Sequence, residues 1–298
     1  MASRIPPLLE SYLGLPQEAS LILLSGVLGS TTNWLVHRYL YSLLASSPSS
    51  SSSSASSPSL PTPRGAEDDG GAQHGVNVVL VSFMRDYAFW KDGAGRLGLD
   101  LDMSAKRGSF AFVDGLSGLF TSASPSHEAR PLMANGPGRR VLSAATPQHL
   151  RTELEDAVAQ VQAAGPGLQT VFIVDQSDLL LAASGDDMSS NELREVLLQV
   201  REKVHSTIVT LSADEPLIAS QTTSLEKQHA SLVLSLAHEA QLVMSLRMLD
   251  TGTARDVSGV LRITPGGESS DSSTPVEERE LLYLVGGDGG VRVFERGQ

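Results

Sequence analysis

Five short runs of almost only apolar residues recur along this chain, and they alternate with segments whose apolar residues are spaced for one face of a helix. The runs are residues 21–24, 78–83, 109–113, 171–174 and 207–211. The helical segments are residues 34–44, 87–97, 146–161, 189–204 and 224–239. Strands without polar alternation are typical of a parallel sheet that is buried on both faces. The order therefore predicts an α/β chain with helices on both faces of a mostly parallel sheet.

The pattern changes near residue 240, after which we expect only strands. They are residues 242–248, 257–263, 281–285 and 291–294. Residues 286–290 read Gly-Gly-Asp-Gly-Gly, which is a hairpin signal. A mostly parallel sheet that is finished by a C-terminal antiparallel extension has a RecA-like order. We therefore expect a single RecA-like domain over residues 1–298.

Serine, proline and glycine interrupt this pattern in three places. Residues 46–60 contain 11 serines in 15 positions, and prolines and glycines continue the stretch to residue 75. Such a composition has little apolar surface to offset its chain entropy, so we expect a disordered insertion over residues 46–75. It lies within the domain, because the residues before it supply only one strand and one helix. Residues 121–140 and 265–275 are predicted to be flexible loops.

Composition excludes several classes of protein. The chain has 34 acidic and 22 basic residues, a net charge of −12, which disfavours a protein that grips nucleic acid over its whole surface. The absence of cysteine excludes disulfides, thiolate catalysis and cysteine-based zinc sites. We find no apolar stretch of membrane-spanning length and no secretory signal. We therefore expect no membrane partner and a location in the cytoplasm and the nucleus.

The turn after the first strand is where an α/β domain of this order usually binds phosphate. Its sequence is Ser-Gly-Val-Leu-Gly-Ser-Thr-Thr, and the degenerate phosphate-loop positions are Gly26, Gly29, Ser30, Thr31 and Thr32. The phosphate loop (Walker A motif) of a nucleotide hydrolase has a lysine directly before its Ser or Thr. Aligning the threonines puts Ser30 at that place, and no lysine precedes Lys91. The sequence favours a plain glycine turn over a magnesium-dependent ATP site.

Asp175 ends the fourth apolar run, as does the aspartate that positions magnesium in nucleotide hydrolases (Walker B motif). The next residue is Gln176, so no adjacent carboxylate is present as a base. Asp175 is equally well explained as a helix or turn cap. It is therefore a Walker B-like position without a full motif.

Two further motifs are rejected. Gly93, Gly95 and Gly98 form the pattern GxGxxG, but they end a helix instead of following a strand, which favours a glycine-rich helix end. The seven histidines form no HxxxH or HExxH pair. We expect neither a dinucleotide fingerprint nor a metal site.

Positive charge is concentrated in residues 85–151, which hold nine basic and six acidic side chains. An RNA-contacting edge is one interpretation of this section. A mixed solvated surface is equally consistent with it. The candidate RNA contacts are Arg85, Lys106, Arg107, Arg130, Arg139 and Arg140.

Residues 79–90 read Val-Leu-Val-Ser-Phe-Met-Arg-Asp-Tyr-Ala-Phe-Trp. They are followed by Gly98-Leu99-Asp100 and by Phe-Ala-Phe-Val-Asp-Gly-Leu at residues 110–116. Together with the strand order and the missing lysine, these residues resemble the Elongator complex protein 6 family, most of all its fungal members. The resemblance spans nearly the whole chain.

The resemblance implies a RecA-like fold with degenerate Walker motifs and a non-catalytic role, without a cofactor of its own. Members of this family assemble with Elongator proteins 4 and 5 into a hetero-hexameric ring within the Elongator complex. The ring binds tRNA and supports wobble-uridine modification, and nucleotide hydrolysis is attributed to the ring. The residues leave open an active RecA-class ATPase acting on its own and, more weakly, a stand-alone binder of a phosphate ligand.

A ring of this kind needs subunit contacts and a central channel. Tyr87, Phe89 and Trp90 are candidate interface residues, because aromatic residues gather where a strand leaves the sheet. Packing in the core of this chain is the alternative, and for Trp90 the core and the interface interpretations are equally consistent with the sequence. In RecA-like rings the loops after the fourth and fifth strands face the channel. Here they carry acids, so RNA affinity would come from partner subunits or from residues 85–151. The acids are Asp178, Asp186, Asp187, Asp214 and Glu215.

Overall fold

The computed structural model describes residues 4–45, 75–120, 136–185, 187–249, 252, 254–268 and 276–296. Of the predicted insertion, only residue 75 is among them. Residues 121–135 and 269–275 of the two predicted loops lie outside the described residues. No helix in the described part of the chain is both long enough and apolar enough to cross a bilayer.

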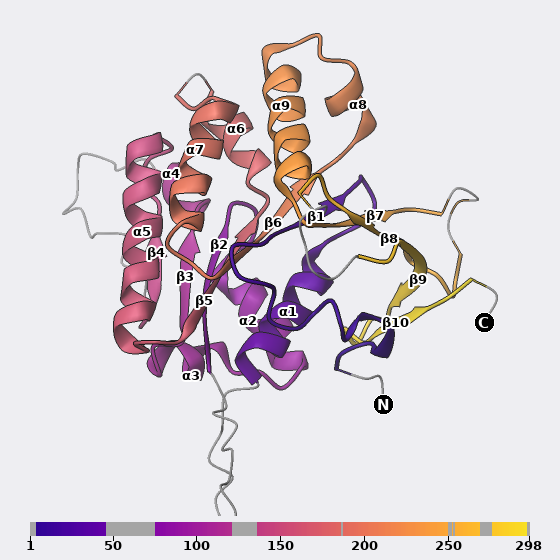
Figure 1. Ribbon diagram of the computed structural model, residues 1–298, viewed down its shortest axis with the longest axis horizontal. Helices are drawn as coiled ribbons and strands as arrows, with labels where there is room; N and C mark the ends of the chain where they lie inside the picture. The colour runs from indigo at the N-terminus through magenta and orange to yellow at the C-terminus, as the bar shows by residue number, and fades with distance from the viewer. Residues whose placement is uncertain are drawn as a thin grey trace, which may run out of the picture.

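The described strands join one ten-stranded sheet, in the order β10-β9-β8-β7-β1-β6-β5-β2-β3-β4 (Figure 1). Neighbouring strands from β4 to β7 are parallel, and β8, β9 and β10 add as antiparallel strands. The RecA-like order is confirmed, with one refinement: the antiparallel extension begins at β8, because β7 pairs parallel with β1. The strands are β1 (Leu21–Gly26), β2 (Val76–Ser82), β3 (Phe110–Asp114), β4 (Arg139–Val141), β5 (Gln169–Asp175), β6 (Ser206–Ser212), β7 (Leu242–Arg247), β8 (Gly259–Pro265), β9 (Arg279–Val285) and β10 (Val291–Phe294).

The helices begin where the sequence supplies caps. Ser189 and Thr223 each accept a hydrogen bond from the backbone N–H three residues later, and the glutamate at that position accepts one in return from the backbone of the capping residue, so each helix begins with a capping box. Pro147 occupies the first turn of its helix, where its fixed φ and missing N–H are tolerated. The helices are η1 (Pro7–Leu9), α1 (Asn33–Ala45), α2 (Tyr87–Arg96), α3 (Leu101–Lys106), α4 (Ser117–Phe120), α5 (Pro147–Ala164), α6 (Asp178–Ser184), α7 (Ser190–Arg201), α8 (Glu215–Ala219) and α9 (Ser224–Glu239).

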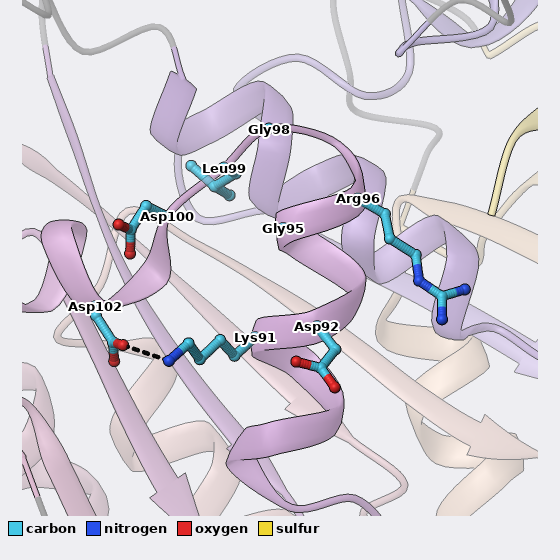
Figure 2. Close-up of a pocket in the computed structure, with 8 residues that line it drawn as sticks. All are labelled: Lys91, Asp92, Gly95, Arg96, Gly98, Leu99, Asp100 and Asp102. Carbon is cyan, nitrogen blue, oxygen red and sulfur yellow. Dashed lines mark ion pairs between the residues drawn. The ribbon is translucent and has the colours of Figure 1, made fainter. Parts of the chain in front are cut away.

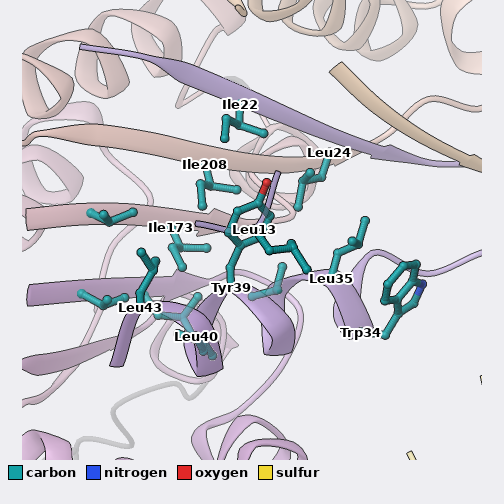
Figure 3. Close-up of a cluster of buried hydrophobic side chains, with 14 of the residues drawn as sticks. Leu13, Ile22, Leu24, Trp34, Leu35, Tyr39, Leu40, Leu43, Ile173 and Ile208 are labelled. Carbon is teal, nitrogen blue, oxygen red and sulfur yellow. The ribbon is translucent and has the colours of Figure 1, made fainter. Parts of the chain in front are cut away.

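Successive residues of the central parallel strands enter two different cores. In β1, Ile22 and Leu24 pack with α1, α2 and α3, whereas Leu21 and Leu23 pack with α5, α7 and α9. Figure 3 shows the first core, in which Tyr39 of α1 lies among strand side chains. Each fully buried leucine contributes roughly 1.5–3 kcal/mol. The near-continuous apolar strands therefore reflect burial on both sides.

The strand β4 corrects the prediction of a flexible loop over residues 121–140. Arg139 pairs in register with Phe112 of β3, and the Phe112 N–H donates to the Gly138 carbonyl at 2.7 Å. Gly138 has φ = +68°, a conformation that favours glycine. The strand was missed because it is three residues long and opens with two arginines.

Candidate functional site

The loop after β1 lies at the carboxyl edge of the parallel strands, where ligands of open α/β sheets bind. It follows Gly26, the last residue of β1, and ends where α1 begins at Asn33. Gly29 has φ = +89°, and a Cβ there would lie 3.3 Å from the side chain of Met248. The glycine turn predicted from the sequence is therefore present, and it needs glycine at position 29.

The hydroxyl groups of this loop are used within the protein. Ser30 Oγ accepts from the Val27 N–H at 3.0 Å and lies 2.8 and 3.0 Å from the carbonyl oxygens of Val27 and Leu246. Thr31 Oγ1 accepts from the Asn33 N–H at 3.2 Å. Thr32 is buried. Ser30 therefore ties the loop to itself and to the end of β7. It carries no positive charge that could pair with a phosphate, as the lysine at this position of a phosphate loop does.

A carboxylate occupies a backbone donor of the same loop. The Leu28 N–H donates to Asp214 Oδ1 at 2.7 Å, across 186 positions of sequence. In phosphate-binding loops such amides face the anion, and their positive end favours negative charge. Here the Asp214 carboxylate accepts the hydrogen bond of that amide and places a negative charge beside the loop. A phosphate group at this place would meet electrostatic repulsion.

Asp175 is fully buried at the end of β5. It accepts hydrogen bonds from Ser82 Oγ at 2.7 Å and Thr210 Oγ1 at 3.0 Å. Burial raises the pKa of Asp175 to about 6, although the two hydroxyl groups oppose that shift. The Asp175 side chain therefore links β5 to its two neighbouring strands, β2 and β6.

The acids after β5 and β6 differ in exposure. Asp178 is buried, and its Oδ2 lies 3.9 Å from Nδ1 of the buried His229 of α9. Burial raises the pKa of Asp178. Asp187 and Glu215 are exposed, and Asp186 lies outside the described residues. The sequence gives no signal of the contact with His229, which comes from a helix 51 positions later.

The candidate interface aromatic residues fall into two groups. Trp90 is fully buried, with its ring centre 4.9 Å from that of His37, so it belongs to the core and not to an exposed contact. Tyr87 and Phe89 are half-buried at the surface of the same core. Phe83 is also buried. Only Tyr87 and Phe89 remain accessible for a subunit contact.

Two candidate RNA contacts, Arg139 and Arg140, are bound within the protein. The Arg139 guanidinium lies 3.6 Å from the Tyr87 ring centre and bonds Asp102 at 2.8 Å. Arg140 bonds Glu153 and Asp156, each at 2.9 Å. Both lie on β4, which corrects their placement in a flexible loop.

Three of the other candidate RNA contacts have exposed side chains. Arg85 is exposed beside the Phe89 ring at 4.9 Å, and Lys106 and Arg107 are exposed at the end of α3. Arg130 lies outside the described residues. The accessible candidates are therefore Arg85, Lys106 and Arg107.

A hollow of about 650 Å³ adjoins α2, and its lining includes Gly95 and Gly98 of the rejected glycine pattern. Figure 2 shows Lys91 reaching Asp102 across it, at 2.7 Å. Asp102 also accepts from the Tyr87 hydroxyl at 2.7 Å, and Lys91 and Tyr87 hold its pKa well below the usual range. Sequence reasoning missed Asp102, which joins α2, α3 and β4. These compensated charges indicate a structural clamp.

Gly93 has a packing role. A Cβ at this position would lie 2.0 Å from Nε2 of His37 on α1. The missing side chain therefore lets α2 approach α1 closely. Among the described residues, no cluster of three or more His, Asp or Glu side chains is arranged to hold a metal ion.

Solved structures resemble this fold at low sequence identity. A KaiC-like protein from Pyrococcus horikoshii OT3 matches with a TM-score of 0.51 and 15% identity, covering 98% of this chain and 97% of that one. An uncharacterized protein from Pyrococcus horikoshii, crystallised with an unknown peptide, matches with a TM-score of 0.56 and 12% identity over the full length of both chains. At this level of identity the likeness concerns the fold alone.

Sequence comparisons identify the family. The Elongator complex protein 6 homolog of Schizosaccharomyces pombe is 27% identical over 203 residues, which is 66% of this chain and 72% of that protein. Elongator complex protein 6 of Xenopus laevis is 24% identical over 232 residues, 75% of this chain and 81% of that protein. The family model described as Elongation complex protein 6 matches residues 72–285. These matches cover most of the strands and helices described above, and the chain belongs to the Elongator complex protein 6 family.

Proposed function

We propose that this chain is a non-catalytic subunit of a hetero-hexameric ring with Elongator proteins 4 and 5. In this proposal the ring contacts the remaining Elongator subunits, binds tRNA and supports modification of the wobble uridine. Family membership supports a place in the Elongator complex. The proposed places of action are the cytoplasm and the nucleus.

The hydrogen bond from the Leu28 N–H to Asp214 carries the non-catalytic part of the proposal. Phosphoryl transfer depends on cations that neutralise the charge of the transferring group. At this loop the lysine position holds Ser30, whose hydroxyl is bound to the loop itself, and the Asp214 carboxylate accepts a hydrogen bond from the loop backbone. Both features oppose the binding of a triphosphate.

The alternative of an ATPase that acts alone is less well supported. It would use Asp175 to position magnesium, but this carboxyl group is fully buried and bound by Ser82 and Thr210. A metal at Asp175 would have to reach a carboxyl group that has no exposed surface. The geometry therefore favours a structural role for Asp175.

In the proposed ring, tRNA contacts from this subunit would come from Arg85, Lys106 and Arg107. These three side chains are exposed, whereas Arg139 and Arg140 are held by carboxylates. Exposed arginine and lysine side chains contact phosphates without reading sequence. Their replacement would weaken tRNA binding uniformly across sequences and reduce its salt dependence.

The test is to purify the chain alone and together with co-expressed Elongator proteins 4 and 5. Native mass spectrometry is expected to show a mixed hexamer, and the isolated chain is expected to show neither calorimetric ATP binding nor ATP turnover. An isolated chain that hydrolyses ATP, with activity lost in Asp175→Ala, would refute the non-catalytic role. A chain that stays alone in the presence of both partners would refute the assembly.

A further inference from the structure

The antiparallel extension has an outer face, which we define as the side of β8–β10 that points away from α1. Val260 pairs with Leu282, and Leu282 pairs with Phe294, so their side chains form one row across three strands. Leu284 lies in the next row, opposite Arg292. The outer face therefore has an apolar centre drawn from all three strands.

This apolar centre departs from the usual pattern of a sheet with one solvated face. Such strands alternate apolar and polar residues, whereas residues 281–285 of β9 are all apolar. Leu281 and Tyr283 are buried in the core beneath the sheet, while Leu282 and Leu284 on the outer face are only half-buried. Strand β9 is therefore apolar on both of its faces, which is typical of a strand that is packed against other elements on both faces.

No described helix supplies that second cover. The core formed with α5, α7 and α9 includes no residue of β8, β9 or β10. Figure 1 shows these helices over the parallel part of the sheet, with β8–β10 extending away from them. Val260 of β8 is nevertheless fully buried. The uncovered part of the outer face is therefore its β9 and β10 side, where Leu282, Leu284 and Phe294 are half-buried.

Arginine side chains surround the apolar centre. The Arg262 side chain is 58% exposed and lies 3.7 Å from Glu278. The Arg296 side chain is 60% exposed, and Arg292 is also exposed. Glu280 lies between Arg247 and Arg296, at 3.5 and 2.6 Å, so one carboxylate serves two guanidinium groups. In a chain with a net charge of −12, this concentration of arginine favours an acidic ligand.

We propose that the outer face docks an acidic segment of a partner subunit that carries an apolar stripe. The inference rests on the proposed assembly and names which surface of this chain takes part in it. The stripe packs on the half-buried Leu282, Leu284 and Phe294. Carboxylates of the partner pair with Arg262 and Arg292 at the margin.

Two other occupants match the surface less well. Single-stranded RNA binds sheets through several stacked aromatic side chains, and Phe294 is the sole aromatic in the row described here. Residues 46–74 of this chain contain one large apolar side chain, Leu60, which cannot cover a row of three strands. A partner protein with several apolar residues fits the observed composition best.

The experiment compares two variants of the outer face with two matched controls on α9. Leu284→Asp and Arg292→Glu change the outer face, and Leu234→Asp and Lys227→Glu make the same changes at exposed positions of α9. Each full-length chain is titrated with Elongator proteins 4 and 5. Hydroxyl-radical footprinting then reports the accessibility of Leu284 and Phe294 in the free and the assembled wild-type chain.

We expect each outer-face variant to raise the dissociation constant about tenfold or more, which is the effect of losing one central contact. Both controls should bind as the wild type does. The Arg292→Glu effect should shrink at high salt, because it comes from charge. Leu284 and Phe294 should become protected on assembly. Since Arg292 is exposed, its variant keeps the test valid even if Leu284→Asp unfolds.

Several results would overturn the inference. Wild-type chain that forms no assembly refutes the proposed function and this inference together. An assembly that forms equally well with both outer-face variants, with unchanged footprints, refutes this inference alone. Weakened tRNA binding with intact assembly would assign the face to RNA. Protection already present in the isolated chain would show that the chain covers the face itself.

Discussion

Replacing Asp175 by asparagine is expected to stabilise this protein at neutral pH. The carboxyl group is fully buried, and burial raises its pKa from the ordinary value of 3.8 to about 6. Above pH 6 the folded protein therefore holds a charge that the unfolded chain solvates better. Since one pKa unit corresponds to about 1.4 kcal/mol, two units correspond to about 3 kcal/mol at pH 7. Asparagine has nearly the same shape and carries no charge.

The stabilisation should depend on pH with a defined sign. As the pH falls from about 6 to about 4, the folded wild type binds a proton before the unfolded chain does and regains stability. The advantage of Asp175→Asn should therefore shrink from about 3 kcal/mol at pH 7 to below about 1 kcal/mol at pH 4. The hydroxyl groups of Ser82 and Thr210 can rotate to serve the amide, so their hydrogen bonds persist.

Urea unfolding followed by tryptophan fluorescence measures this difference, because Trp34 and Trp90 are both buried in the folded chain. Unfolding is recorded for the wild type and Asp175→Asn at several pH values between about 4 and 8. Asp92→Asn, at an exposed position of α2, is the control and should change stability by less than about 0.5 kcal/mol. An asparagine variant that is less stable than the wild type at pH 7, or whose difference ignores pH, would refute the reasoning.

Three further predictions concern the helices. Gly93→Ala should destabilise the fold by about 2 kcal/mol, because the new Cβ would overlap His37 Nε2. In urea unfolding, adding His37→Ala to this variant should reduce the cost, because the clashing ring is then absent. Burial lowers the His37 pKa to about 4, so the unfolded chain binds a proton at this histidine before the folded chain does. The free energy of unfolding should therefore fall by about 3 kcal/mol as the pH drops from 6.5 to 4. His37→Gln should remove this fall from the free energy of unfolding measured against pH. Ser189→Ala should cost about 1 kcal/mol in thermal unfolding, whereas Ser143→Ala, outside any helix cap, should cost less.

Local patterns predicted much of the fold. The apolar runs located β1 and β5, because a strand buried on both sides needs no alternation. The predicted helices over residues 189–204 and 224–239 begin within one residue of α7 and α9, and the capping boxes at Ser189 and Thr223 that fix these starts lie within one turn of sequence. These signals depend only on neighbours in sequence.

The features that the sequence did not reveal depend on distant partners. Asp214 and Leu28 meet only because β1 and β6 are adjacent in the sheet. Asp178 is buried because α9 brings His229 against it. The parallel pairing of β7 with β1 likewise follows from topology, and no residue within β7 announces it. For the candidate site, the sequence indicated the missing lysine but not the carboxylate beside the loop.

The short strand β4 has a consequence for association in the crowded cell. A terminal strand with free backbone groups invites a foreign strand to add to it, which leads to aggregates. Arg139 and Arg140 dominate β4 and are tied to Asp102 and Glu153, so their bulky charged side chains stay fixed along this border. Any intruding strand would have to displace two ion pairs for very few new backbone bonds. This border of the protein is thereby protected against lateral growth.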